Sequence, residues 1–133
     1  MITLYYYIYE FKTVINKKTR VEFIQKFPKI AVCLIHNPET NITSRGFTVC
    51  SDIEIPYFIS KKEGRRRARA RALEANGTKK NNYPVTQTAI LNILDRMQVP
   101  EFCYWHKSAY DCSLASFESI LIEKAIGAKT NGA

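Results

Sequence analysis

The highest concentration of charged side chains in this 133-residue chain is a run of arginines in the middle of the sequence. Five of them fall within seven positions, at Arg65, Arg66, Arg67, Arg69 and Arg71. A guanidinium group binds phosphate through two parallel hydrogen bonds, so such a run indicates an anionic partner. The alternative interpretation is a solvated basic helix that binds nothing, and the run alone does not decide between the two.

Small residues alternate with these arginines. The ones that share a helix face, at i, i+4, i+8 and i+11, are Gly64, Ala68, Ala72 and Ala75. That face has little side-chain volume, so we predict that the helix lies close to a sheet. Arg65 and Arg69 would then flank one side of the small face, and Arg67 and Arg71 the other.

Aromatic side chains that could stack on a nucleobase lie elsewhere in the chain. Tyr104, Trp105 and His106 are consecutive, and Phe58 lies in a proline-containing connector before the arginine run. Each has core packing as the alternative role, and for Trp105 the core is the more common place. The consecutive tyrosines 5–7 are more typical of strand packing than of a base-stacking platform.

Patterns for catalysis or for a resident cofactor are missing. The chain has neither a Walker loop nor a G-x-G-x-x-G segment, and its carboxylates are few and scattered. Cys103, His106 and Cys112 could be proposed as zinc ligands, but their spacing matches no common zinc site. We therefore predict a binding protein rather than an enzyme, with no metal and no cofactor.

Composition indicates one folded basic domain over residues 1–133. Hydrophobic residues make up 46% of the chain and the formal net charge is +8, which favours an anionic partner. The chain has no apolar run long enough to span a membrane and no secretory signal, so we expect a cytoplasmic protein without a membrane segment. The four cysteines form no C-x-x-C pair and are expected to stay reduced.

Strands are predicted in the N-terminal half. Residues 2–12 are rich in β-branched and aromatic side chains, and neither face of that strand is clearly polar, so both faces are expected to be covered. Residues 21–27 suit either a strand or a helix. A β-hairpin is predicted over residues 29–51, with its loop at 36–41.

Two details of that hairpin bear on its packing. If its turn centres near Asn41, Cys33 and Cys50 lie opposite each other, where two buried thiols are more typical than a disulfide. Gly46 lies inside the second strand. A glycine there indicates a bulge or the close approach of another backbone.

Helices are predicted over residues 61–76, 84–97 and 113–126. The first begins after Ser60, which with Glu63 fits a capping box, and it is expected to stop at Asn76-Gly77. Pro84 suits the first turn of the second helix.

The third predicted helix is expected to bury one apolar face and to end at Gly127. The residues of that face are Leu114, Phe117, Ile120, Leu121 and Ala125. Strands that precede helices along the chain predict an α+β fold, an antiparallel β-sheet packed by about three α-helices.

Two short motifs resemble a known family. The hairpin ends as R-G-x-x-x-C-S over residues 45–51, and the arginine helix opens as G-R-x-x-A-x-x-R-A over residues 64–72. This pair resembles small phage proteins that include the Thoeris anti-defence proteins, which are sponges for cyclic nucleotide signals. The resemblance covers roughly residues 30–76.

The resemblance implies an antiparallel sheet with helices that assembles as a homodimer or a higher homo-oligomer. It also implies a cyclic ADP-ribose isomer, or in some members a cyclic di- or trinucleotide, bound whole at subunit interfaces. Arg65 and Arg71 match the two arginines of the helix motif, while Arg45 and Ser51 match the hairpin end. The other arginines of the run exceed the motif.

Two functions follow as hypotheses. The first is an anti-defence protein that sequesters an anionic cyclic nucleotide immune signal in the host bacterial cytoplasm. The second is a nucleic-acid-binding accessory protein of a phage or mobile element, with Lys79, Lys80 and Lys107 adding to the basic patch. A weaker third is an inhibitor whose basic face binds an acidic protein. The candidate ligand-binding residues are Arg45, Ser51, Phe58, Arg65, Arg69, Arg71, Tyr104, Trp105 and His106.

Overall fold

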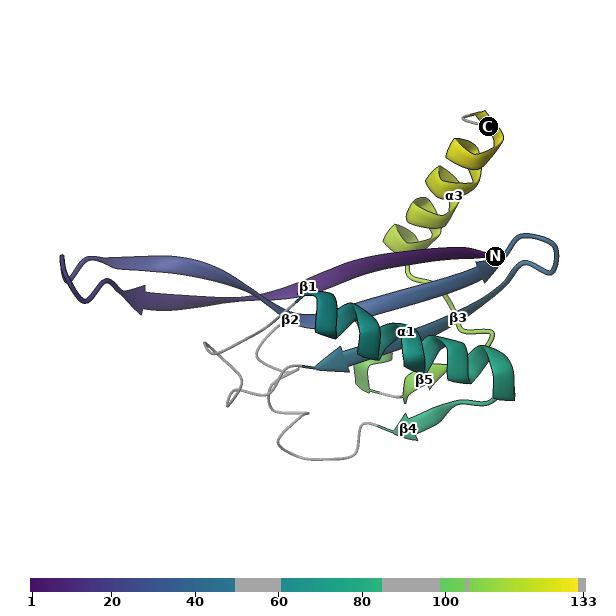
Figure 1. Ribbon diagram of the computed structural model, residues 1–133, viewed down its shortest axis with the longest axis horizontal. Helices are drawn as coiled ribbons and strands as arrows, with labels where there is room; N and C mark the ends of the chain where they lie inside the picture. Colours follow the sequence, from purple (N-terminus) through teal and green to yellow (C-terminus); the bar gives the residue numbers. More distant parts are fainter. Residues whose placement is uncertain (50–60, 85–98, 105, 132–133) are drawn as a thin grey trace.

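The computed structural model describes residues 1–49, 61–84, 99–104 and 106–131 (Figure 1). In these ranges the chain forms a five-stranded antiparallel sheet with the strand order β1-β2-β3-β5-β4. Two α-helices and a short 3₁₀ helix accompany the sheet in the same ranges, so the predicted α+β class is confirmed.

The strands are β1 (Ile2–Ile15), β2 (Glu22–Asn37), β3 (Ile42–Val49), β4 (Asn82–Pro84) and β5 (His106–Ala109). The helices are α1 (Lys61–Thr78), the 3₁₀ helix η1 (Glu101–Tyr104) and α3 (Ser116–Asn131). Residues 21–27, which suited a strand or a helix by sequence, are almost entirely part of β2, which continues without interruption into the predicted hairpin.

β1 and β2 form a hairpin that projects from the body of the protein. From Ile30 toward the start of β2, the described part of β3 no longer pairs with β2. Within the described residues, β1 and β2 continue there as a two-stranded ribbon (Figure 1). We call residues 9–28 the arm. Its tip is a turn in which the Arg20 N–H donates to the Asn16 carbonyl oxygen at 2.7 Å and Arg20 adopts a φ of 56°.

The arm begins at a shift in register. Ile8 pairs with Ile30 but Tyr9 pairs with Pro28, which leaves Lys29 as the additional residue of β2. Proline has no N–H to donate to a neighbouring strand and is usually found at such irregular positions. The extra residue is in β2, so β1 remains regular through the junction.

The β2–β3 hairpin has a register different from the one expected. Asn37 pairs with Ile42, and Cys33 pairs with Gly46. The prediction that Cys33 faces Cys50 is therefore wrong, because the turn is centred before Asn41 rather than on it. Cys50 itself lies outside the described residues.

Helix α1 lies across one face of β2 and β3 (Figure 1). The predicted small face is confirmed, since Ala68, Ala72 and Ala75 are fully buried. A Cβ atom added at Gly64 would lie 3.1 Å from the Ala31 Cβ atom, so this end of the helix also sits close to the sheet.

Gly46 is the point where α1 and the sheet come closest. A Cβ atom built on Gly46 would lie 2.3 Å from the Ala68 carbonyl oxygen and 2.3 Å from the Ala72 nitrogen. No side chain fits in that space, which explains why β3 carries a glycine here. The close backbone approach expected from sequence is confirmed.

Helix α1 ends slightly later than predicted. It continues through Asn76 and Gly77 to Thr78. The terminating residue with a left-handed conformation is Lys79, at a φ of 56°, and its N–H donates to the Ala75 carbonyl oxygen at 2.8 Å.

The second predicted helix, over residues 84–97, is wrong at its first residue. Pro84 is the last residue of β4 and pairs with His106 of β5. An edge strand accepts proline because its outer N–H groups have no strand to bond. Residues 85–98 lie outside the described part of the chain.

The other face of the sheet is covered by η1 and by the start of α3. Its fully buried cluster consists of Ile30, Val32, Phe47 and Cys103. Helix α3 contacts the sheet only through its first turns and then projects away (Figure 1). Unlike the helix predicted over residues 113–126, it begins at Ser116 and continues through Gly127 to Asn131.

The predicted buried face of α3 is partly wrong. Phe117 and Ile120 are 41% and 50% exposed, whereas Glu118 and Ile122 are buried. The reason is that Glu118 forms an ion pair inside the protein, which rotates the helix so that this residue, and the one a turn later, face inward.

Candidate functional site

Cationic and aromatic side chains gather between the first turns of α1 and the adjacent side of β1. Three cations stand at i, i+4 and i+8 on the helix, and three tyrosines alternate along the strand. Together these residues form what we call the tyrosine–arginine surface: Lys61, Arg65, Arg69, Tyr5, Tyr7 and Tyr9. The i+4 spacing places the cations on one side of the helix, and strand alternation points the three rings to one face.

Contacts join the two rows. The Arg65 Nη1 atom donates to the Tyr7 hydroxyl at 3.2 Å. The Lys61 ammonium lies 5.0 Å from the ring centroid of Tyr7 and 5.6 Å from that of Tyr9. From the arm, the Lys26 ammonium lies 3.9 Å from the Tyr9 centroid. Cations therefore border the tyrosine rings from both the helix and the arm.

Sequence reasoning assigned tyrosines 5–7 to strand packing, and the structure divides them. Tyr6 points to the face opposite α1, where it donates to the Glu118 Oε2 atom at 2.8 Å. Tyr5 and Tyr7 point to the α1 side, and Tyr5 is 37% exposed. The signal that could have separated them is the alternation of a strand, combined with the i+4 spacing of the helix cations.

Two ionisable groups at this surface have raised pKa values. Burial raises the pKa of Tyr5, with the Arg69 and Arg65 guanidinium groups opposing the rise. Beneath the surface, burial raises the pKa of the Cys33 thiol to about 12, so Cys33 remains protonated and is a poor nucleophile. Arginine keeps its charge at every physiological pH.

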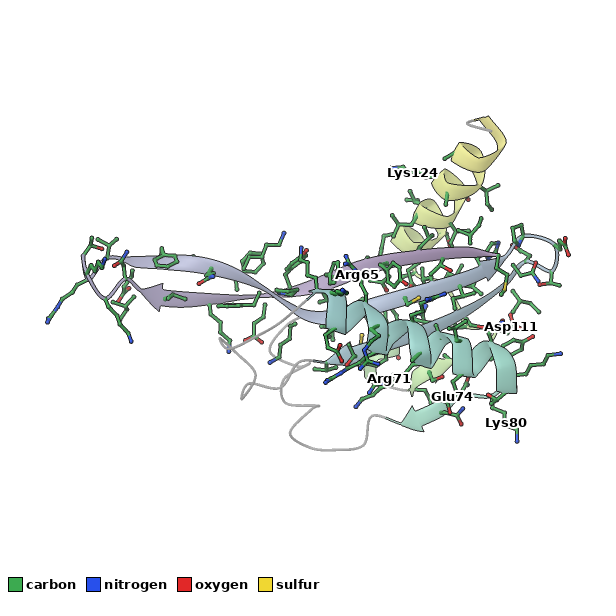
Figure 2. All side chains as sticks on the ribbon, in the orientation of Figure 1. Arg65, Arg71, Glu74, Lys80, Asp111 and Lys124 are labelled. Atoms are coloured by element: carbon green, nitrogen blue, oxygen red, sulfur yellow. The ribbon has the colours of Figure 1, made fainter. Side chains whose placement is uncertain are left out.

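Arg71, the second arginine of the helix motif, lies on the other side of α1. Its Nη1 atom donates to the Phe47 carbonyl oxygen of β3 at 2.7 Å. Figure 2 shows Arg65 on the β1 side of the helix and Arg71 on the opposite side. The two sides predicted for the helix are therefore confirmed for Arg65 and Arg71, and the two motif arginines do not lie together.

The remaining arginines of the run contact a carboxylate on their own helix. Arg66 donates to Glu63 from Nε at 2.9 Å and from Nη2 at 2.5 Å, and the Arg67 Nε atom donates to it at 3.1 Å. Arg66, followed by Arg67, holds the pKa of Glu63 near 2. Ser60, the predicted capping partner of Glu63, lies outside the described residues.

Arg45 is buried and engaged inside the protein. Its Nε atom donates to the Glu118 Oε2 atom at 2.9 Å and its Nη2 atom to Oε1 at 2.5 Å. The same Nη2 atom donates to the Ser113 carbonyl oxygen at 2.8 Å, and the guanidinium carbon lies 3.8 Å from the Phe102 ring centroid. The expected ligand-binding arginine of the hairpin therefore holds α3 against the sheet.

Glu118 was not singled out from the sequence. Besides Arg45 and Tyr6, its carboxylate accepts a hydrogen bond from the Ala115 N–H at 2.9 Å, as in a capping box. Burial, followed by the adjacent Glu118 carboxylate, raises the pKa of Tyr6 far above its ordinary value. The sequence carries no signal for this helix start, because Ala115 has no side-chain acceptor and only the Glu118 half of the capping box is present.

A pocket of about 660 Å³ opens between η1, β5 and the segment before α3. Its lining includes His106, Tyr110, the carboxylates of Glu101 and Asp111, and the ion-paired Arg45. His106 was a predicted ligand-binding residue, and it lies here rather than at the tyrosine–arginine surface. Two carboxylates beside a neutralised arginine make this pocket a poor site for phosphate.

The structure describes only some of the remaining predicted site residues. Ser51, Phe58 and Trp105 lie outside the described residues, and Tyr104 is the last residue of η1. In the described ranges, no three His, Cys, Asp or Glu side chains gather as metal ligands do. Cys112, one of the zinc ligands considered by sequence, donates its thiol to the Thr43 carbonyl oxygen at 3.3 Å.

Comparisons of the chain with protein-family models, with curated proteins and with solved structures find no match. Of the helices in the described part of the chain, none combines the length and apolarity needed to cross a membrane. The function of the tyrosine–arginine surface must therefore be inferred from its own residues.

Proposed function

We propose that this protein binds an anionic cyclic nucleotide at the tyrosine–arginine surface and sequesters it without cleaving it. The observation that carries the proposal is the hydrogen bond from the Arg65 guanidinium to the Tyr7 hydroxyl. The Lys61 ammonium lies beside the same tyrosine ring. A cyclic nucleotide presents charged phosphates and flat bases. Guanidinium and ammonium groups bind the phosphates, and tyrosine rings stack on the bases.

The ligand class that fits best is a cyclic ADP-ribose isomer. Its pyrophosphate would lie along Arg65 and Arg69, which are one helical turn apart on the same side of α1. Its adenine would lie on the row formed by Tyr5 and Tyr7. The resemblance to Thoeris anti-defence proteins supports the same ligand class, since Arg65 is one of the motif arginines. It also implies that the protein would act in the cytoplasm of an infected bacterium.

Binding without cleavage agrees with the titration behaviour of the surface. The pKa of Tyr5 is raised and that of the Cys33 thiol is about 12, so these groups keep their protons at neutral pH. General acid–base catalysis needs a group whose pKa lies near the working pH. The arginines hold charge but transfer no proton.

The test is recovery of the ligand after binding. The purified protein is incubated with a cyclic ADP-ribose isomer, separated from free ligand, denatured, and the released molecules are identified by mass spectrometry. We expect the ligand to return with its mass and chromatographic retention unchanged. A cleaved product would reject sequestration, and no retained ligand would reject this ligand class.

Nucleic-acid binding is the second candidate, favoured by one observation. The cations Lys61, Arg65 and Arg69 lie in a line along α1, and Lys26 continues the cationic border onto the arm. Such a line suits a linear polyanion, and the ring centroids of Tyr7 and Tyr9 lie 6.1 Å apart, a spacing compatible with successive unstacked bases. Fluorescence anisotropy with a labelled single strand tests it: affinity must fall steeply between 50 and 200 mM salt.

A further inference from the structure

The arm exposes an unusual number of large apolar side chains. Those between 45% and 72% exposed are Phe11, Ile15, Val21, Phe23 and Ile24. A two-stranded ribbon gains little stability in water when nothing covers it. Two of these side chains, Phe11 and Ile15, belong to β1, which is therefore apolar where the arm is exposed.

The outer edge of β1 presents backbone N–H and C=O groups to which another strand could bond. Within the described ranges, β2 is the only strand that pairs with β1, which makes β1 an edge strand. β1 spans Ile2–Ile15 without a proline, and its edge stays regular because the extra residue at the arm junction belongs to β2. A long, regular and apolar edge is a template for another strand.

We propose that two copies of this chain pair through their β1 edges, antiparallel, about a two-fold axis that passes through Phe11. Residues equally distant from Phe11 then face each other across the two strands. The sheets of the two copies would join into one continuous sheet through the arms. This inference does not rest on the proposed function.

The sequence of β1 is complementary to itself in this register. Glu10 faces Lys12 of the second copy, and Lys12 faces its Glu10. The flanking pairs are Tyr9 with Thr13, Ile8 with Val14 and Tyr7 with Ile15. Opposite charges and matched apolar side chains directly across two antiparallel strands stabilise the pairing.

The charges of β1 are compatible with a second copy at this edge, unlike the charge of the chain as a whole. The chain carries a formal net charge of +8, so most of its surface repels another copy. β1 holds one glutamate and one lysine and is therefore neutral. Glu10 and Lys12 already contact each other at 3.2 Å on one face of the strand, where the axis would place the second pair beside them.

A cysteine at the axis tests the register directly. Facing residues of two antiparallel strands have Cα atoms about 4.5–5.5 Å apart, which suits a disulfide. Phe11→Cys should therefore form a disulfide-linked dimer on mild oxidation. Thr13→Cys should not cross-link to itself, but should cross-link to Tyr9→Cys when the two variants are mixed.

The wild-type chain, oxidised in parallel, reports any cross-link through the native thiols. In light scattering, the mass of the wild-type protein is expected to be twice the chain mass of 15.3 kDa. Glu10→Lys should raise the dissociation constant at least tenfold, and Glu10→Lys combined with Lys12→Glu should restore it. A monomer at tens of micromolar, or Thr13→Cys cross-linking alone as fast as Phe11→Cys, overturns the proposal.

Discussion

Arg45 and Glu118 form a two-point ion pair inside the protein, with Nε–Oε2 and Nη2–Oε1 distances of 2.9 and 2.5 Å. The pair joins the middle of β3 to the first turn of α3. Both residues are almost fully buried, with exposures of 3% and 0%. A charge buried to this degree is tolerated only when its partner is present.

Breaking this pair should destabilise the protein strongly. Glu118→Leu leaves a buried guanidinium without its carboxylate, and we expect a loss of about 3–5 kcal/mol in the free energy of unfolding. Urea unfolding followed by circular dichroism measures it. The control is Arg45→Met combined with Glu118→Leu, which removes both charges and should recover most of the loss. Equal losses in the single and double variants would contradict a specific pair.

Gly46→Ala should displace α1 from the sheet. The new methyl group would lie 2.3 Å from two backbone atoms of the helix, which cannot move like a flexible side chain. We expect a loss of about 3–5 kcal/mol or failure to fold. Gly77→Ala is the matched control, because a Cβ atom there meets nothing within 4 Å, and it should stabilise α1 by about 0.5–1 kcal/mol. Thermal unfolding of both variants measures the two changes in stability. A Gly46→Ala protein with an unchanged unfolding midpoint would refute the close approach.

Ligand affinity should depend on the side of α1 that faces β1. Arg65→Ala with Arg69→Ala removes two charge-assisted donors, each worth about 1.5–3 kcal/mol, so binding of a cyclic ADP-ribose isomer should weaken by a factor of about 100 or more. Arg66→Ala with Arg67→Ala makes the same change in net charge on the other part of the helix. Isothermal titration calorimetry should show nearly unchanged affinity for this control. Equal losses in both variants would favour nonspecific charge attraction.

Arg71→Ala is expected to act on stability rather than on ligand affinity. The Arg71 guanidinium donates to the Phe47 carbonyl oxygen, which would lose that donor, at a cost of about 1–3 kcal/mol. Urea unfolding and calorimetry on the same sample separate the two effects. Loss of ligand binding with an unchanged unfolding midpoint would show that Arg71, and not only Arg65, contacts the ligand.

Stability should fall as the pH drops below about 6.5 because of His36. Burial lowers the pKa of His36, whose Nδ1 atom is hydrogen-bonded with the Thr43 hydroxyl at 2.7 Å. Between the ordinary histidine pKa and the lowered one, the unfolded chain binds a proton that the folded chain does not. The free energy of unfolding therefore decreases on acidification, by up to about 1.4 kcal/mol per pH unit. His36→Gln should flatten the profile between pH 7 and 5, and a wild-type profile that is already flat would contradict the prediction.

Local spacing was sufficient to predict α1 and its contact with the sheet. The small face of Gly64, Ala68 and Ala72 repeats with the period of a helix, and Gly46 breaks a strand of larger residues. Both signals report the same steric fact, which is that two backbones touch. The alternation along β1 was also visible in the sequence, although its tyrosines were assigned to packing alone.

The register of the β2–β3 hairpin and the buried face of α3 could not be read in the same way. A shift of the turn by a residue or two changes which residue faces Cys33, and residue composition does not define the turn that closely. Helical periodicity treats Glu118 as an outward residue. Only the fold places a guanidinium where that carboxylate can be buried.

The sequence by itself determined the class of the fold, the helix that lies on the sheet, and a basic chain with five arginines in one run. These follow from short-range periodicity and from charge, which each segment carries alone. The tertiary structure alone decided which residue each arginine contacts, because side chains far apart in the chain had to be brought together. It placed Arg65 beside Tyr7, Arg71 on β3 and Arg45 against Glu118.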